Sequence, residues 1–210
     1  ISPGHKHPML SILVLLAPAV SADWPPSFCH GIDCPKYTVT GNFGNDSNTL
    51  EVRKYPTALW TSTDVKANNE DTALMTGFGR LFSYISGANA KKEKVDMTSP
   101  VMCRVKEVGQ GPFCNTTFTV SFFVPFKHQE DAPQPTDPSV YLDMVEDREV
   151  AVLQGSGYWY QKDVLNYVAK ASKILDESDV KYNSSTYTFA GYDPPFRLFG
   201  RHNEVWIDLV

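Results

Sequence analysis

The chain has 210 residues, of which 42% are hydrophobic and 20% charged, and its formal net charge is −5. This size and composition suit one globular domain with a sizeable core. The acidic balance, without a cluster of basic residues, argues against nucleic acid and against an anionic membrane as partners.

The N-terminal segment contains an uncharged apolar run at residues 10–20. Its length is typical of the core of a secretory signal and is too short to span a bilayer. Small residues at Val20 and Ala22 predict cleavage after Ala22, so residues 1–22 are predicted to be a signal peptide and residues 23–210 one secreted, extracellular domain without a membrane span. A buried N-terminal strand or helix is the alternative.

Four cysteines follow the predicted cleavage site, and an even number in a secreted chain favours disulfides. Of the three possible pairings, the two local ones are favoured, because a turn-like segment at residues 109–112 separates the second pair. A zinc site that combines thiols with His30 is the alternative. The expected pairs are Cys29 with Cys34 and Cys103 with Cys114.

Three Asn-X-Ser/Thr triplets lie in turn-like stretches. In a secreted protein such triplets accept glycans. The predicted glycosylation sites are Asn45, Asn115 and Asn183.

The first half of the domain predicts two strands, a helix and two more strands. Residues 50–55 and 58–65 are strand-like and are separated by Pro56. A polar stretch at residues 68–71 supplies helix-capping residues, apolar residues then recur at helical spacing, and Gly87 ends the pattern. The closing strands are predicted at residues 95–105 and 117–124.

After a Pro-rich link, the same order recurs. Strands are predicted at residues 141–145 and 150–154, a helix at 162–176, and closing strands at 186–190 and 204–209. Each half has one helix to cover one face of its sheet. The sequence therefore predicts an α+β fold, a distorted antiparallel β-barrel made of two pseudo-symmetric β-α-β halves with two main helices.

The sequence offers little that suggests catalysis. The histidines after residue 22 are His30, His128 and His202, and their spacing fits no metal or nucleophile motif. No common catalytic or nucleotide-binding motif is present, and Gly155-Ser156-Gly157 lacks the strand-to-helix context of a nucleophile turn. We therefore expect a binding protein and not an enzyme, with neither catalytic residues nor a protein metal site.

The first predicted helix carries a wide apolar surface. Met75, Phe78 and Phe82 follow one another at i, i+3 and i+7. Each residue taken singly is more readily explained as core, but part of the stripe is a candidate lining for a groove that binds a flat apolar ligand.

Five motifs in register resemble the SOUL haem-binding protein family, and the similarity runs from about residue 37 to residue 209. The motifs are Leu50-Glu51-Val52-Arg53-Lys54-Tyr55, Tyr84-Ile85-Ser86-Gly87-Ala88-Asn89, Met97-Thr98-Ser99-Pro100-Val101, Ala190-Gly191-Tyr192-Asp193-Pro194-Pro195-Phe196 and Arg201-His202-Asn203-Glu204-Val205-Trp206. The resemblance implies non-covalent binding of haem or another porphyrin, between the first helix and a loop near the C-terminus. The binding residues that it implies are Met75, Phe78, Phe82, Ser83 and Arg197.

This sequence departs from the family pattern at three positions. Met75 and Ser83 stand where some members have basic residues, and Lys54 stands where some have a candidate haem-ligating histidine. A protonated lysine is a poor iron ligand. We therefore expect a secreted carrier or scavenger that encloses tetrapyrrole in a hydrophobic groove with little or no iron ligation. The alternative is a protein-interaction module that has kept the fold and lost this binding.

Overall fold

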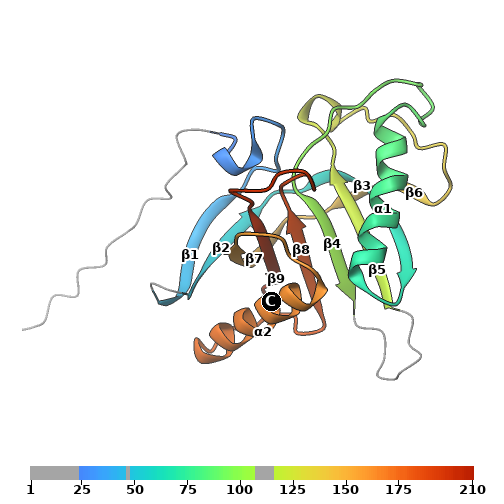
Figure 1. Cartoon of the computed structure of the whole chain (residues 1–210). Coiled ribbons are helices and arrows are strands. Elements are labelled where there is room, and N and C mark those ends of the chain that lie inside the picture. The colour runs from blue at the N-terminus through green and yellow to red at the C-terminus, as the bar shows by residue number, and fades with distance from the viewer. Residues whose placement is uncertain (1–23, 46–47, 107–115) are drawn as a thin grey trace, which may run out of the picture.

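Nine strands form one antiparallel sheet, and two helices cover the same face of it (Figure 1). The computed structural model describes residues 24–45, 48–106 and 116–210, so the predicted signal peptide and Asn115 lie outside the described residues. Neither helix in the described part has the length and apolar character needed to cross a membrane. The main elements are β1 (Thr38–Asn45), β2 (Asn48–Tyr55), β3 (Ala58–Ala67), α1 (Glu70–Ile85), β4 (Val101–Lys106), β5 (Thr116–Phe123), β6 (Val140–Val145), β7 (Arg148–Gly155), α2 (Gln161–Glu177), β8 (Thr186–Gly191) and β9 (Asn203–Asp208).

The order of the strands confirms the two similar halves. Across the sheet the order is β1-β2-β7-β9-β8-β4-β5-β3-β6. The first half consists of β2, β3, α1, β4 and β5, and the second half of β6, β7, α2, β8 and β9. If β1 is left out and each strand is replaced by its equivalent in the other half, the same order results, read from the opposite edge of the sheet. The first strand of each half therefore pairs with a strand of the other half: β2 pairs with β7, and β6 pairs with β3. This exchange interlocks the halves.

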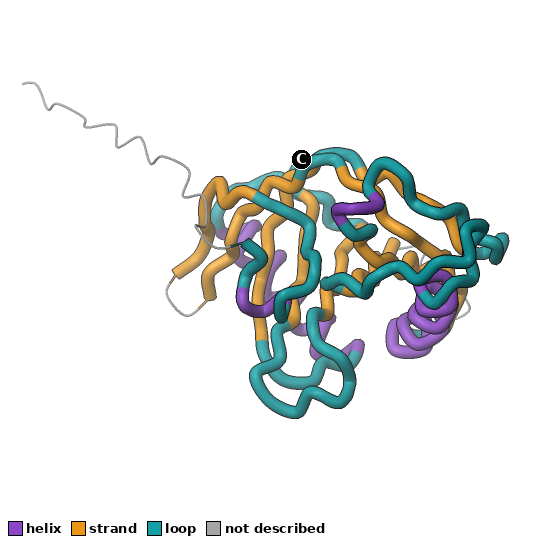
Figure 2. The backbone as a smooth tube through the Cα atoms, turned by 90° about the horizontal axis from the view of Figure 1, so that it is seen from above, coloured by secondary structure: helices purple, strands orange, loops and turns teal. Residues whose placement is uncertain are grey.

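The short links between strands bend the sheet strongly. β2 and β3 are six places apart in the sheet, about 29 Å if the sheet were flat. Only residues 56–57 connect them, and such a link spans at most about 11 Å. The equivalent link, residues 146–147, meets it through a hydrogen bond from Asp147 N to Thr57 Oγ1 (3.1 Å). Seen from above, the sheet accordingly bends around, and α1 lies outside it (Figure 2).

The sheet is nevertheless not closed. β1 and β6 are its two edges and do not pair with each other, so the expected barrel is only an approximate description. β4 is also shorter than predicted and begins at Val101, because Pro100 has no N–H to donate to the strand ladder.

Side chains alternate between two cores, as the strand geometry requires. On β7, Ala151 and Leu153 face the helices, whereas Val150 and Val152 face the other way. The core beneath the helices is the larger of the two. The core on the inner face of the bent sheet is covered by the N-terminal segment, residues 24–37, which packs Trp24, Phe28 and Tyr37 against it.

Local signals explain where α1 begins and ends. The Asn69 side chain caps the helix by accepting a hydrogen bond from Thr72 N (2.8 Å), and two acidic residues occupy the first turn. Gly87, at φ 116°, lies just beyond the helix in a conformation that favours glycine. The predicted helices are confirmed at α1 and α2.

One predicted disulfide is present and the other is wrong. Cys29 and Cys34 are joined, and both are buried. Cys103 is a free, fully buried thiol. The register of β4 and β5 places Val120 opposite Cys103. Cys114 itself lies outside the described residues.

Replacing both Cys29 and Cys34 by Ser should destabilise the protein by about 2 kcal/mol, since the bridge closes only a short loop. Urea denaturation of the full chain measures this change. Wild-type protein under reducing conditions provides the control and should lose the same amount. An unchanged denaturation midpoint in both cases would show that the bridge contributes nothing.

Candidate functional site

The outer face of α1 is unusual because it carries no charge. Its most exposed large residue is Met75, at 79%, and Phe82 is 51% exposed. Arg80 does not interrupt this face, because it is turned to β3, where its Nη1 donates to Thr63 Oγ1 and to Asp64 O, both at 3.1 Å. The exposed residues from the first turn to the C-cap are Thr72, Met75, Thr76, Gly79, Phe82, Ser83 and Ser86.

The equivalent helix of the second half provides an internal comparison. The exposed face of α2 is rich in charge, as is usual for a helix that faces water. It presents Lys162, Lys170, Lys173, Asp176 and Glu177 beside Leu165, Asn166 and Ala169. The two helices hold equivalent places in the repeat, so exposure alone does not explain the uncharged face of α1.

The structure divides the predicted stripe of α1 between core and surface. Phe78 is half-buried and packs edge-on against Phe122, with ring centroids 5.2 Å apart. The Phe82 ring stacks on Phe78 at 5.8 Å and extends from it into solvent. The Ser83 hydroxyl donates back to Gly79 O (3.0 Å) and so does not project outward. The result is an apolar surface centred on Met75 and Phe82.

A second exposed apolar surface lies in the loop between β8 and β9. Phe196, Leu198 and Phe199 are 81%, 66% and 85% exposed. The loop backbone is well held: Tyr158 Oη donates to Pro195 O (2.8 Å), and Arg201 Nη1 donates to Pro194 O (2.7 Å). The sequence patterns above do not predict this surface, although its three apolar residues follow directly after two prolines and are interrupted only by Arg197.

Arg197 lies in this loop, but its polar contacts lead away from α1. Its Nε lies 3.1 Å from Asp193 Oδ1, and its Nη1 lies 3.4 Å from His30 Nδ1. Asp193 also bonds His30 Nε2 (2.7 Å) and accepts from His202 N (2.6 Å). Arg197 is therefore held against the N-terminal segment and is grouped with the residues of α1 by its motif position alone.

Lys54 is remote from α1. It lies on β2, where its register partners are Thr38 and Glu149. Helix α1 packs instead on β3, β4, β5 and β6. The position at which some family members have a candidate ligand therefore does not reach the α1 surface in this chain.

The inner face of the sheet contains a buried ion pair. Arg53 Nη1 donates to both carboxylate oxygens of Glu204, at 3.0 and 3.1 Å, and neither residue is exposed. Glu204 also accepts from Tyr192 Oη (2.8 Å) and Trp206 Nε1 (2.7 Å). Burial opposes ionisation of Glu204, but the charge of Arg53, helped by His202, lowers its pKa to about 2.

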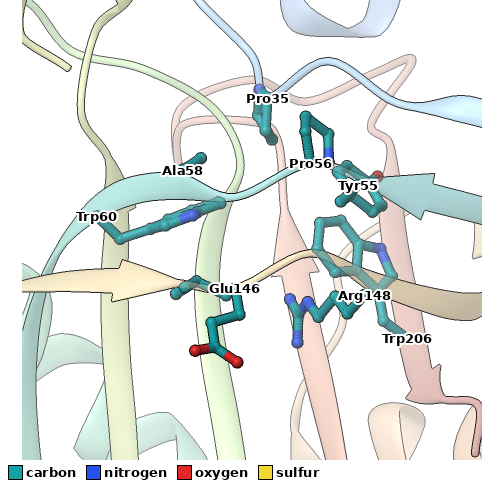
Figure 3. Close-up of a pocket in the computed structure, with 9 residues that line it drawn as sticks. Pro35, Tyr55, Pro56, Ala58, Trp60, Glu146, Arg148 and Trp206 are labelled. Atoms are coloured by element: carbon teal, nitrogen blue, oxygen red, sulfur yellow. The ribbon is translucent and has the colours of Figure 1, made fainter.

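A small pocket lies on the same inner face, where the two short links meet (Figure 3). Tyr55, Trp60 and Trp206 form its walls, with Arg148 beside them. Its enclosed volume is only about 10 Å³, far below the roughly 300–1,000 Å³ of small-molecule sites. None of the predicted ligand residues lines it. Among the residues that the structure describes, no three His, Cys, Asp or Glu side chains form a group that could hold a metal ion.

Comparison with known proteins identifies the family. The model of the SOUL heme-binding protein family matches residues 32–208. The chain belongs to the SOUL family. It is 34% identical to heme-binding protein 2 of Homo sapiens over 176 residues, which cover 84% of this chain and 85% of that protein. It is 35% identical to heme-binding protein 1 of Xenopus laevis over 168 residues, covering 77% of this chain and 84% of the relative.

A solved structure shares the fold of this SOUL protein at much lower identity. The C-terminal domain of EcmrR superposes with a TM-score of 0.57 at 8% identity, covering 78% of this chain and 98% of that domain. At this identity the likeness concerns the fold alone.

The SOUL motifs themselves are mostly internal in the structure. Arg53, Tyr192, Glu204 and Trp206 come from three different motifs and meet in the buried network of the inner face. Asn89, from another motif, donates to Tyr84 O and Glu93 O and holds the chain after α1. The motifs that carry the resemblance therefore build the frame, and the exposed side chains of α1 lie outside them.

Proposed function

We propose that this protein binds haem or a related tetrapyrrole non-covalently on the outer face of α1, and that it is an extracellular carrier and not an enzyme. The observation that supports this most directly is the uncharged exposed face of α1, centred on Met75 and Phe82. Large apolar patches on a protein surface mark sites of interaction. Membership of a family whose members are named for heme binding supports a tetrapyrrole as the ligand.

The chemistry of α1 suits a flat apolar ring. A thioether and a phenyl ring provide polarizable contact area, and the stacked pair of Phe78 and Phe82 provides a wall. Arg197 is a candidate partner for a propionate by its motif position alone. A guanidinium pairs well with a carboxylate, but the contacts of Arg197 in this structure are with Asp193 and His30 and not with α1. A propionate would share Arg197 with Asp193.

Two of the three described histidines are held by carboxylates, and the third, His128, lies in the short helix after β5 and not on α1. His30 bonds Asp193, and His202 bonds Glu204 Oε1 (2.7 Å). On the α1 surface, the thioether sulfur of Met75 is the candidate ligand for the iron ion. We therefore infer that contact with the ring carries the affinity, and that the metal-free porphyrin binds about as tightly as haem.

A titration of the full chain with ferric protoporphyrin IX, and separately with metal-free protoporphyrin IX, tests this function. We expect saturable spectral shifts at micromolar protein and dissociation constants that agree within about threefold, a difference below 1 kcal/mol. Absence of saturable binding by both porphyrins would refute the function and favour a protein-interaction module on the same fold.

A matched pair of variants tests the surface. Phe82→Asp should weaken porphyrin binding at least about tenfold, because it removes a ring and places a charge that must be desolvated. Leu165→Asp on α2 is the control, since Leu165 is 44% exposed and Phe82 51%. Neither change should alter stability by more than about 1 kcal/mol. Equal loss of binding in both variants, or none in either, would place the ligand elsewhere.

The extracellular location is a separate proposal. It is supported by the expected signal peptide and by the Cys29–Cys34 bridge, because disulfides persist mainly in oxidising compartments. Asn183 lies in the loop before β8, where its Oδ1 accepts from Ser185 N (3.0 Å). Expression of the full chain in secretory cells should release protein that begins at residue 23 and whose mass falls on enzymatic deglycosylation. Retention inside the cell with an intact N-terminus would contradict this location.

A further inference from the structure

Helix α1 contains two glycines, and the structure explains only one of them by packing. A glycine inside a helix costs roughly 0.5–1 kcal/mol relative to alanine. At Gly77, an added Cβ would lie 2.5 Å from Val120 Cγ2 and 2.6 Å from Val120 Cβ. Gly77 is therefore required for the close approach of α1 to β5.

Gly79 has no such explanation. An added Cβ there would meet nothing within 4 Å, and the residue is exposed in the middle of the helix. Its φ is not in the region that favours glycine. Neither packing nor backbone conformation accounts for a residue that weakens the helix at this position.

The surroundings of Gly79 form a shallow notch in the uncharged face. Met75 lies one turn before it, Ser83 one turn after it, and Phe82 on its flank. Because the Ser83 hydroxyl is bonded to Gly79 O, it does not fill the space above the glycine. The floor of the notch is bare helix backbone, and its sides are two large exposed side chains.

We propose that Gly79 is the point at which the flat face of the tetrapyrrole lies against α1, so that this residue determines the fit of a planar ligand. The inference rests on the proposed function. Dispersion between carbon atoms needs separations of about 3.5–4 Å. A side chain at position 79 would hold a flat ring away from the backbone while Met75 and Phe82 contact its edges.

The shape of the notch favours a ring over a second helix. Close helix packing through small residues uses positions four apart. The residue four after Gly79 is the small Ser83, but the residue four before it is Met75, which is 79% exposed and would obstruct a neighbouring helix. A planar ligand is thin, so its face can rest on the backbone at Gly79 while its periphery contacts Met75 and Phe82.

Gly79→Ala tests this inference, because it should make the protein more stable and its binding of porphyrin weaker. The melting temperature should rise by about 2–4 °C, because alanine favours the helix. The dissociation constant of metal-free protoporphyrin IX should rise at least about fivefold, and further in Gly79→Leu. Ala169→Leu adds the same side chain to the outer face of α2 and should leave binding unchanged.

The outcomes separate this inference from the proposed function. If wild-type protein binds no porphyrin, both fail. If wild-type protein binds and the two Gly79 variants bind equally well, the site at Gly79 is refuted while the function stands. If Gly79→Leu changes the oligomeric mass and leaves porphyrin binding intact, the notch receives a second copy of the chain, and the inference is overturned.

Discussion

Replacing Glu204 by Gln should reduce the free energy of unfolding at pH 7 by about 3–5 kcal/mol, because it leaves the fully buried Arg53 without its main counter-charge. Glu51 still contacts Arg53, with Oε2 at 2.7 Å from Nη2, but its side chain is 24% exposed and water weakens the attraction. Urea denaturation measures the loss. Glu51→Gln is the control and should cost less than about 1 kcal/mol.

The ion pair also has a defined pH dependence. The pKa of Glu204 is lowered from 4.5 to about 2, so its stabilising effect is fully present above about pH 4.5 and is lost as the pH falls towards 2. Wild-type protein should lose this contribution in that range, and Glu204→Gln should not.

A double-mutant cycle with Arg53→Met then isolates the coupling between the two side chains. The double variant should be more stable than the sum of the single losses implies. Additive losses, or a Glu204→Gln variant as stable as wild type, would show that the pair does not hold the inner face together.

Replacing Glu70 by Gln should have the opposite effect and stabilise the protein at neutral and alkaline pH. Glu70 is 2% exposed, and neither of its carboxylate oxygens accepts a hydrogen bond from an N–H or O–H group. Burial raises its pKa from 4.5 to about 8; the charge of Asp71 adds to this rise, and the Cys103 thiol partly offsets it. The carboxyl is therefore mostly protonated in the folded protein at pH 7.

The direction in which stability changes with pH follows from the raised pKa of Glu70. The folded state holds this proton up to about pH 8, whereas the unfolded chain releases it near pH 4.5, so wild-type stability falls as the pH rises between these values. The loss amounts to roughly 3 kcal/mol by pH 7. Glu70→Gln should remove this slope. Urea midpoints at pH 5, 7 and 8.5 measure it, with the exposed Glu177→Gln on α2 as the control. A wild-type slope that persists in Glu70→Gln would assign it to another group.

Much of the fold was predictable because its signals are local. Capping residues and helical spacing located both helices, and strand-like runs located eight of the nine strands. β1 was missed because Gly41 and Gly44 interrupt its pattern and its exposed residues look loop-like. The bridge between Cys29 and Cys34 was also predictable, since the two residues are only five apart.

The candidate surface was predictable only in part. Helical spacing identified Met75, Phe78 and Phe82, but it could not show that Phe78 enters the core while the other two stay exposed. The importance of Gly79 was not visible either, because a glycine in a sequence does not reveal what surrounds it. The difference between Gly77 and Gly79 depends on β5, which is about 40 residues away.

The sequence by itself determined the order of the elements, the repeat and, through five motifs, the family. Those properties depend on neighbours along the chain. Only the tertiary structure decided that the halves exchange β2 and β6, that the sheet stays open, that Cys103 faces Val120 and that Glu70 is buried without a counter-charge. Each of these depends on contacts between distant segments, whose register is set by packing the whole sheet and not by any local pattern.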